Sequence, residues 1–306
     1  MSLILYRKSM KSFFVDYKKF LENFSLTKFP VGLGGCRNNG HSFECCEHNI
    51  TVFDEKNEND SIIEFENEFI KLHHGSLEES RNEILTQYAN LKILWDEKWE
   101  LRIFLTKIKD KKEKIFKAYA KSCLIDASVC AVKTKEGLKN SDPFASTWIK
   151  CSAYFIADAI FLANSKNPSP AHMLDNLREF EKNKINENFS IVNDCIGIER
   201  ATPSLLSRMC KSSLGFSDMI EQNDHSKIIQ KKHDYFIENS LISDCYFYLG
   251  YINRNNFMKI KDSLHRRPEL IHILKVAFDV DNDQTKIKHQ ADVLHKTAND
   301  MVLQIT

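Results

Sequence analysis

The residues best suited to chemistry begin with a glycine-rich stretch near the start of the chain. Residues 31–40 read VGLGGCRNNG and hold four of the nine glycines in the sequence. Glycine has no Cβ, so the backbone amides of such a turn can approach a bulky anion and point toward its oxygens. Gly34, Gly35, Cys36 and Arg37 are therefore the predicted phosphate-binding residues. The alternative is that Gly34-Gly35 is only a tight turn between a strand and a helix.

Polar side chains that could hold a metal ion follow this turn. Residues 47–53 read EHNITVF and have the composition of a strand, on which Glu47 and Asn49 alternate and share one face. A hairpin is expected over residues 61–74, where a slip of one residue in register exchanges the two faces of a strand. Glu66 and Glu68 could point to the face of Glu47 and Asn49, with Lys71 or His73 equally able to take that position.

The order of these residues resembles the nucleotidyltransferase (polymerase-beta-like) superfamily, whose mark is Gly-Gly-Ser, a short helix, and Ser-Asp-x-Asp leading into a strand. In that alignment Cys36 takes the place of the serine, and Glu47 and Asn49 take the places of two metal-binding aspartates. The resemblance implies Mg²⁺ and a nucleoside triphosphate as ligands. It also implies catalytic roles for Glu47, Asn49 and a third carboxylate, for which we take Glu68, and a metal held by Glu47 and Asn49.

Three departures from the superfamily pattern weaken the predicted site. Glu47 moves its carboxylate by one methylene, Asn49 offers a neutral oxygen, and the Cys36 thiol is a weaker donor than a hydroxyl. Magnesium prefers anionic oxygen ligands in near-octahedral geometry. We therefore predict a degenerate site that binds a nucleotide or small ligand with weak or lost transferase activity. The alternative is an active enzyme that moves a nucleotidyl group from a Mg²⁺-bound triphosphate to a small acceptor.

The same segment has a rival interpretation as a zinc site, and hence as a zinc-binding structural protein. Zinc prefers thiolate and imidazole ligands, and five such residues lie within thirteen positions. They are Cys36, His41, Cys45, Cys46 and His48. Their spacing matches no common zinc motif, and adjacent cysteines point apart in an extended chain, so this interpretation ranks below both nucleotidyltransferase hypotheses.

The elements that must position these residues are mixed in the first hundred residues and helical afterwards. Helices are expected at 3–24 and 76–89, and strands at 49–53, 61–74 and 91–95. After residue 101 only helical patterns occur, so we predict an α+β fold: a nucleotidyltransferase-like domain over 1–110 with a small mixed sheet, then an all-α domain over 111–306. Within it, residues 154–164 followed by Pro168-Ser169-Pro170 resemble the helical substrate-side domain of aminoglycoside-type nucleotidyltransferases.

Composition narrows the class of protein further. The 43 Lys and Arg nearly balance the 42 Asp and Glu, so the chain has no overall field that would hold a nucleic acid or an anionic membrane. The apolar stretch 144–163 contains Lys150 and Asp158, which favours a buried helix over a membrane span. The nine cysteines follow no disulfide pattern and no signal peptide is evident, so we expect a cytoplasmic protein with reduced thiols.

Overall fold

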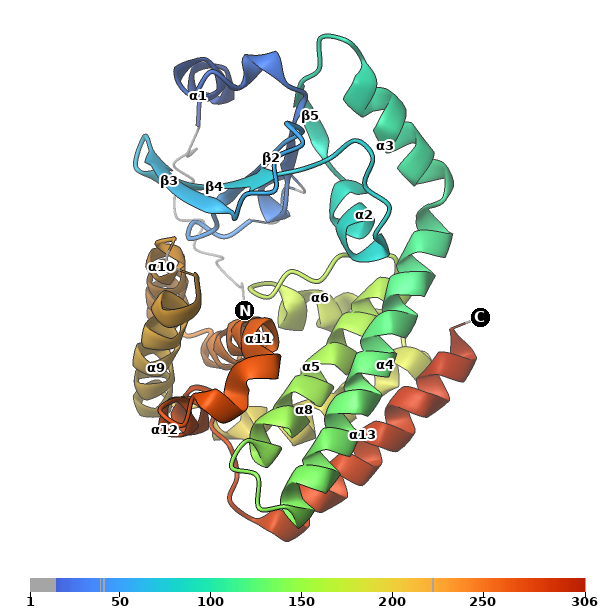
Figure 1. The fold of residues 1–306 in the computed structure, drawn as a ribbon, viewed down its shortest axis with the longest axis vertical. Coiled ribbons are helices and arrows are strands. Elements are labelled where there is room, and N and C mark those ends of the chain that lie inside the picture. Colours follow the sequence, from blue (N-terminus) through green and yellow to red (C-terminus); the bar gives the residue numbers. More distant parts are fainter. Residues whose placement is uncertain (1–14, 39, 41, 222, 306) are drawn as a thin grey trace, which may run out of the picture.

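The chain folds into a five-stranded mixed sheet with a few helices, followed by a helical remainder (Figure 1), in a computed structural model that describes residues 15–38, 40, 42–221 and 223–305. This confirms the predicted α+β class. The elements of the sheet region are α1 (Tyr17–Asn23), β1 (Val31–Gly34), the 3-10 helix η2 (Cys36–Asn38), β2 (His48–Val52), β3 (Ser61–Phe65), β4 (Glu68–His74), α2 (Asn82–Tyr88), β5 (Lys92–Trp95) and α3 (Glu100–Asp110).

Helices make up the second part of the chain, and no strand occurs in its described residues. The long helix α4 has α5 and the C-terminal helix α13 packed along it, while α9, α10, α11 and α12 form a second group (Figure 1). The bounds are α4 (Lys112–Lys139), α5 (Ala145–Ala163), α6 (Met173–Glu179), α7 (Lys184–Glu187), α8 (Phe189–Ile196), α9 (Pro203–Glu221), α10 (His225–Glu238), α11 (Ile242–Ile260), α12 (Leu270–Ala277) and α13 (Gln284–Gln304). The division between domains at residue 110 stays a prediction; the break between α3 and α4 falls there.

The sheet has the strand order β3-β4-β2-β1-β5. Strand β1 pairs antiparallel with β2 and β5, β2 pairs in parallel with β4, and β4 returns antiparallel to β3. The β3–β4 hairpin turns through Glu66 and Asn67, which both adopt a positive φ. The strands expected at 49–53, 61–74 and 91–95 are thus confirmed.

The two faces of the sheet have different surroundings. Ile50 and Val52 of β2 share a hydrophobic cluster with Ile70 of β4 and with Phe20 of α1. Because side chains alternate along a strand, Glu47, Asn49 and Thr51 point to the opposite face. That face carries the candidate site.

Two helix boundaries differ from the expectation. Helix α2 begins at Asn82 rather than Ser76, because the Ser76 hydroxyl accepts from the amide of Glu78 and the Glu79 carboxylate accepts from the next two amides. Such local side-chain bonds compete with a helix. Residues 233–251 form one continuous helical pattern in the sequence, but the chain divides them between α10 and α11 near Ser240, which has a φ of 58°. Of the helix expected over 3–24, residues 1–14 lie outside the described residues.

Helix α5 is buried on nearly every side, as expected for residues 144–163. Both of its charged side chains form hydrogen bonds inside the protein. Lys150 donates to the carbonyl oxygen of Ile196 at 2.6 Å, and burial lowers the pKa of Lys150 to about 7, with Arg200 acting in the same direction. Asp158 accepts from Tyr251 at 2.7 Å and from the Arg254 guanidinium at 2.6 Å. Throughout the described residues, no helix combines the length and apolarity needed to span a bilayer.

Several side chains join the sheet to the helical part. Phe43, just before β2, packs against His172, Tyr235 and Phe236 of the helical part. The Asn167 side chain donates to the carbonyl of Thr86 at 2.6 Å. Helix α10 lies under β3 and β4 (Figure 1), where its lysines reach the sheet. The candidate site therefore lies where the two parts meet.

Candidate functional site

The glycine turn leaves β1 and enters η2, and it brings Asn49 to its backbone. Gly34 pairs with Asn49 across the β1–β2 ladder. Gly35 has a φ of 70°, and a Cβ built on it would lie 2.6 Å from Asn49 Nδ2. Only glycine combines this backbone conformation with so close a neighbour. Gly35 is exposed, so its backbone is open to solvent.

The carboxylate of Glu47 forms an ion pair with a lysine of the same chain. Its Oε2 atom lies 2.6 Å from Nζ of Lys232 on α10, and both side chains are largely buried, at 15% and 9% exposure. Burial alone would raise the pKa of Glu47, but the charge of Lys232, together with the hydrogen bonds that the carboxylate accepts from Lys232 and from the backbone, lowers that pKa. Glu47 is therefore an ionised carboxylate whose charge is neutralised within the protein.

A lysine stands beside Asn49 on the neighbouring strand. The β2–β4 register pairs Asn49 with Lys71 and Thr51 with His73, all on the same face. The Asn49 amide oxygen lies 3.2 Å from His73 Nε2, while Asp60 pairs with His73 at 2.8 Å and with Lys71 at 3.1 Å. Burial works against ionisation of Asp60, but His73 and Lys71 hold its pKa well below the usual value. The polar network beside Asn49 therefore consists of two basic side chains, His73 and Lys71, and the Asp60 carboxylate that pairs with both.

The other candidates for a third acidic ligand are directed elsewhere. Because side chains alternate along β4, Glu68 lies on the same face as Ile70, which is opposite to that of Asn49. Its carboxylate is 3.5 Å from Arg37 and 3.2 Å from Lys231. Glu66 in the hairpin turn pairs with Lys19 of α1. Neither is in a group of three or more converging His, Cys, Asp or Glu side chains within the described residues.

Arg37 holds the segment before β2 in place. Its guanidinium donates to the carbonyl of Cys46 at 2.7 and 3.0 Å and to that of Glu44 at 3.1 Å. With Glu68 as its ionic partner, this side chain is 11% exposed. In this arrangement Arg37 positions the backbone at 44–46.

These residues do not fit the Mg²⁺ ion that the resemblance implies. Magnesium demands near-octahedral coordination by hard oxygen ligands, usually one or two carboxylates besides water and phosphate. Here the Glu47 carboxylate is paired with Lys232, Asn49 supplies a neutral amide, and the neighbouring position holds Lys71. A dication would have to displace one ammonium and lie near another.

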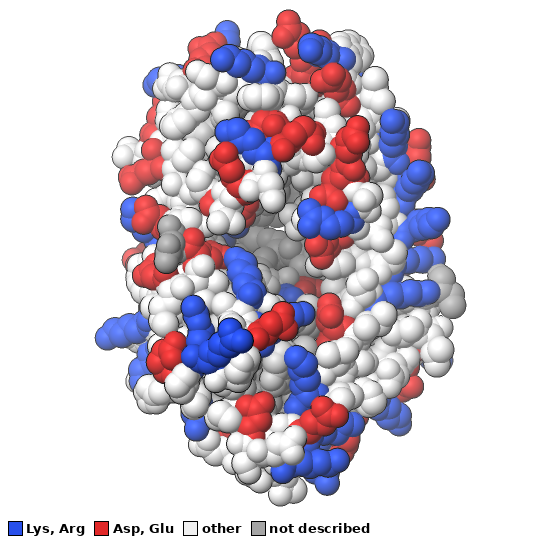
Figure 2. All heavy atoms as spheres, viewed as in Figure 1, with Lys and Arg blue, Asp and Glu red and all other residues white. Residues whose placement is uncertain are grey.

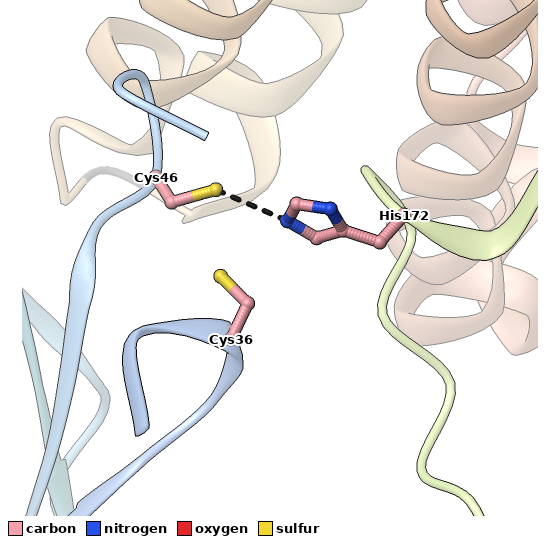
Figure 3. A group of neighbouring side chains, drawn as sticks. All are labelled: Cys36, Cys46 and His172. Carbon is pink, nitrogen blue, oxygen red and sulfur yellow. Dashed lines mark hydrogen bonds between the residues drawn. The ribbon is translucent and has the colours of Figure 1, made fainter. Parts of the chain in front are cut away.

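A different group converges at the same turn: the side chains of Cys36, Cys46 and His172 (Figure 3). Cys36 opens η2, Cys46 lies two residues before β2, and His172 comes just before α6 in the helical part. Their ligand atoms all lie within 4.8 Å of one another, and Cys46 Sγ is 3.3 Å from His172 Nε2. Among the residues that the structure describes, this is the one group of its kind.

Hydrogen bonds of this cluster converge on the Cys46 thiol. Contacts with Cys36, Cys45 and His172 lower the pKa of the Cys46 thiol. The hydrogen bond to Cys46, together with burial, raises the pKa of the Cys36 thiol, and the same causes raise that of Cys45. The arrangement thus favours one thiolate, at Cys46, held by neighbouring donors.

The zinc ligands expected from the sequence are only partly brought together. Cys36 and Cys46 converge, whereas Cys45 is buried beside them but outside the group. His48 points to the other face of the sheet, where its Nδ1 lies 2.7 Å from the Tyr17 hydroxyl. Burial, together with the charges of Arg37 and Lys231, lowers the pKa of His48 to about 4. His48 is therefore not a ligand of this cluster, and His41 lies outside the described residues.

Sequence reasoning missed His172 and Lys232, which complete the two features of the site. Both come from the helical part, more than a hundred residues after the glycine turn. His172 lies two residues after the Pro168-Ser169-Pro170 segment, whose position after an aromatic helix was the one signal that pointed to this region.

Charge on the molecular surface is mixed rather than segregated. On the face drawn in Figure 2, Lys and Arg side chains are interspersed with Asp and Glu over both the sheet and the helical part. This agrees with the near-zero net charge. No extended single-sign patch covers the described residues of this face.

Comparisons with known proteins give a distant match. No protein-family model and no curated protein sequence matches the chain. Among solved structures, it is similar to a nucleotidyltransferase-like protein from Exiguobacterium sibiricum 255-15, with 7% sequence identity and a TM-score of 0.37 over 84% of this chain and 89% of the other. Because the likeness is so distant, function has to be inferred from the residues of the site.

Proposed function

We propose that this chain is a nucleotidyltransferase-like protein whose site binds a nucleotide or small anionic ligand and has lost metal-dependent transfer. The observation that carries this proposal is the ion pair between Glu47 and Lys232, at 2.6 Å and largely buried. Phosphoryl chemistry of the nucleotidyltransferase kind relies on metal ions to neutralise the charge that develops on the phosphates. In this chain the Glu47 carboxylate, which would hold such an ion, is paired with the Lys232 ammonium.

Two features support retention of a ligand. The exposed turn at Gly35 presents backbone without a Cβ, as a phosphate-binding turn requires. Asn49 and the adjacent Lys71, which is paired with Asp60 at 3.1 Å, supply an amide and an ammonium group on the same face of the sheet. Ligand binding by this site would therefore depend on backbone amides and lysine rather than on Mg²⁺.

Calorimetry tests the proposal directly. ATP, GTP, CTP and UTP are titrated separately into the full chain, in EDTA and then in Mg²⁺ or Mn²⁺, and pyrophosphate release is followed in parallel. We expect binding of at least one triphosphate with an affinity that the metal does not increase, and no pyrophosphate. Pyrophosphate release, or binding that requires the metal, would support the active alternative instead. The absence of heat with every triphosphate would refute ligand binding.

A restored site provides the matched test. Asn49→Asp combined with Lys232→Met returns an acid to position 49 and frees the Glu47 carboxylate. We expect this double variant to gain Mn²⁺ affinity, whereas Asn49→Asp alone should gain little, because Lys232 still neutralises Glu47. Equal gains in the two variants would show that Lys232 does not block the metal.

A further inference from the structure

The thiol and imidazole cluster offers a second site, with a chemistry different from that of the glycine turn. Thiolate and imidazole are the ligands that zinc prefers, while magnesium prefers oxygen. Six further cysteines lie in the helices, at positions 123, 130, 151, 195, 210 and 245, and all are buried. In the described part of the chain, none of those six is in a converging group with other possible ligands. Cys36 and Cys46 are therefore distinct from the cysteines that only fill the core.

The observed spacing is close to that of a tetrahedral zinc site. Zinc–sulfur distances of about 2.3 Å and zinc–nitrogen distances of about 2.0 Å place a sulfur and a nitrogen ligand roughly 3.5 Å apart. Cys46 Sγ and His172 Nε2 are 3.3 Å apart, and Cys36 Sγ lies within 4.8 Å of both. Figure 3 shows the three side chains pointing toward a common centre from three separate segments.

Neighbouring residues hold the three ligands in these positions. Arg37 donates to the carbonyl of Cys46 and thereby fixes the backbone of that ligand. The amide of His172 donates to the carbonyl of Ser169 at 2.8 Å, and its ring lies against Phe43 with centroids 4.2 Å apart. Metal sites whose ligands are already held in place by neighbouring residues bind the metal without a large conformational rearrangement.

We propose that Cys36, Cys46 and His172 bind a zinc ion that joins the glycine turn to the helical part, with the fourth coordination position open to solvent or a ligand. Glu47 and Lys232 lie beside the cluster as an ion pair, so their charges largely offset each other. Cys36 is only half-buried, which leaves access from solvent. The inference does not depend on nucleotide binding.

Metal analysis and cobalt substitution test the site without any nucleotide. The full chain is purified under reducing conditions from medium supplemented with zinc, and its metal content is measured after dialysis. The metal-free protein is then titrated with Co²⁺ under nitrogen. We expect one zinc per chain, and one Co²⁺ with tetrahedral d–d bands and a thiolate-to-cobalt charge-transfer band.

Four variants separate ligands from structural effects. Cys36→Ala and Cys46→Ala should each remove about half of the charge-transfer intensity, in keeping with two thiolate ligands, and lower affinity by more than the roughly 10–100-fold that loss of an outer-shell group causes. His172→Asn should weaken binding while keeping the charge-transfer intensity per bound cobalt. Cys130→Ala, a buried thiol in α4, is the matched control and should bind as the unmodified chain does.

Removal of the metal gives an independent readout. Because the ion would bind only the folded chain, a chelator should lower the unfolding temperature of the unmodified protein and of Cys130→Ala. It should leave that of Cys36→Ala unchanged. The proposal is overturned if the reduced protein binds neither zinc nor cobalt, or if Cys130→Ala loses the cobalt spectrum as fully as Cys36→Ala.

Discussion

Replacing Lys232 by methionine removes the ammonium that faces the Glu47 carboxylate at 2.6 Å. At an effective dielectric constant of about 20, the attraction between the two charges at that distance is about 6 kcal/mol. Part of this attraction only offsets the loss of hydration of the two buried groups. Removing one partner of a buried pair then costs about 3–5 kcal/mol, because the other charge is left without compensation. For a chain of 306 residues that corresponds to roughly 5–8 °C in the unfolding temperature.

A double-mutant cycle measures this coupling. The free energy of unfolding in urea is determined for the unmodified chain, Glu47→Gln, Lys232→Met and the double variant. We expect each single variant to lose about 3–5 kcal/mol and the double variant to lose much less, since it leaves no buried charge. Lys227→Met, which breaks an exposed pair with Asp224 on the same helix, is the control and should leave unfolding unchanged.

The result also bears on the proposed function. A coupling energy below about 1 kcal/mol is the range of solvated surface pairs. That value would mean that Glu47 is not neutralised by Lys232. The Glu47 carboxylate would then be free to bind a Mg²⁺ ion.

Three other predictions concern the glycine turn and two buried bases. Gly35→Ala should lower the free energy of unfolding in urea by more than Gly40→Ala does. Both residues have a φ near 70°, which costs an alanine about 1–2 kcal/mol, but only a Cβ at Gly35 meets Asn49. Asn49→Ala should therefore restore part of the stability lost in Gly35→Ala. His48 has a pKa of about 4, below its unfolded value near 6.5, so the unfolded chain binds its proton first and stability should fall as pH drops from about 6.5 to 4. In His48→Gln that loss should shrink, and an unchanged acid profile would contradict it. Lys150 has a pKa of about 7, so between about pH 7 and 10.5 the unfolded chain binds more protons than the folded chain and Lys150 should add stability as pH rises. The difference in unfolding free energy between the unmodified chain and Lys150→Met should therefore change over that range, and a constant difference would contradict this.

Local patterns in the sequence were sufficient for most of the sheet. Alternation along residues 47–53 predicted Glu47 and Asn49 on one face, and the glycine pair correctly predicted a turn, against which Asn49 lies. Helix α5 was recognised as buried from its nearly continuous apolar residues. These features depend on neighbours within a few positions, which periodicity and glycine conformation describe well.

The chemistry of the site depended on residues that local patterns do not connect. Lys232 reaches Glu47 from α10, and His172 reaches Cys46 from the segment before α6. No periodicity links positions more than a hundred residues apart. The register of β4 was likewise open, and it placed Lys71 rather than an acid beside Asn49. The expected start of α2 at Ser76 was wrong because local hydrogen bonds of Ser76 and Glu79 prevailed over helix capping.

The contacts between the sheet and the helical part bear on how the chain could be divided. Residue 110 separates the two in sequence, yet Glu47 and Glu68 have their lysine partners on α10. A fragment ending at residue 110 would expose Phe43 and leave both carboxylates without these cations. A truncation designed at the apparent boundary would therefore lose these contacts, and co-expression of the two segments would be the way to preserve them.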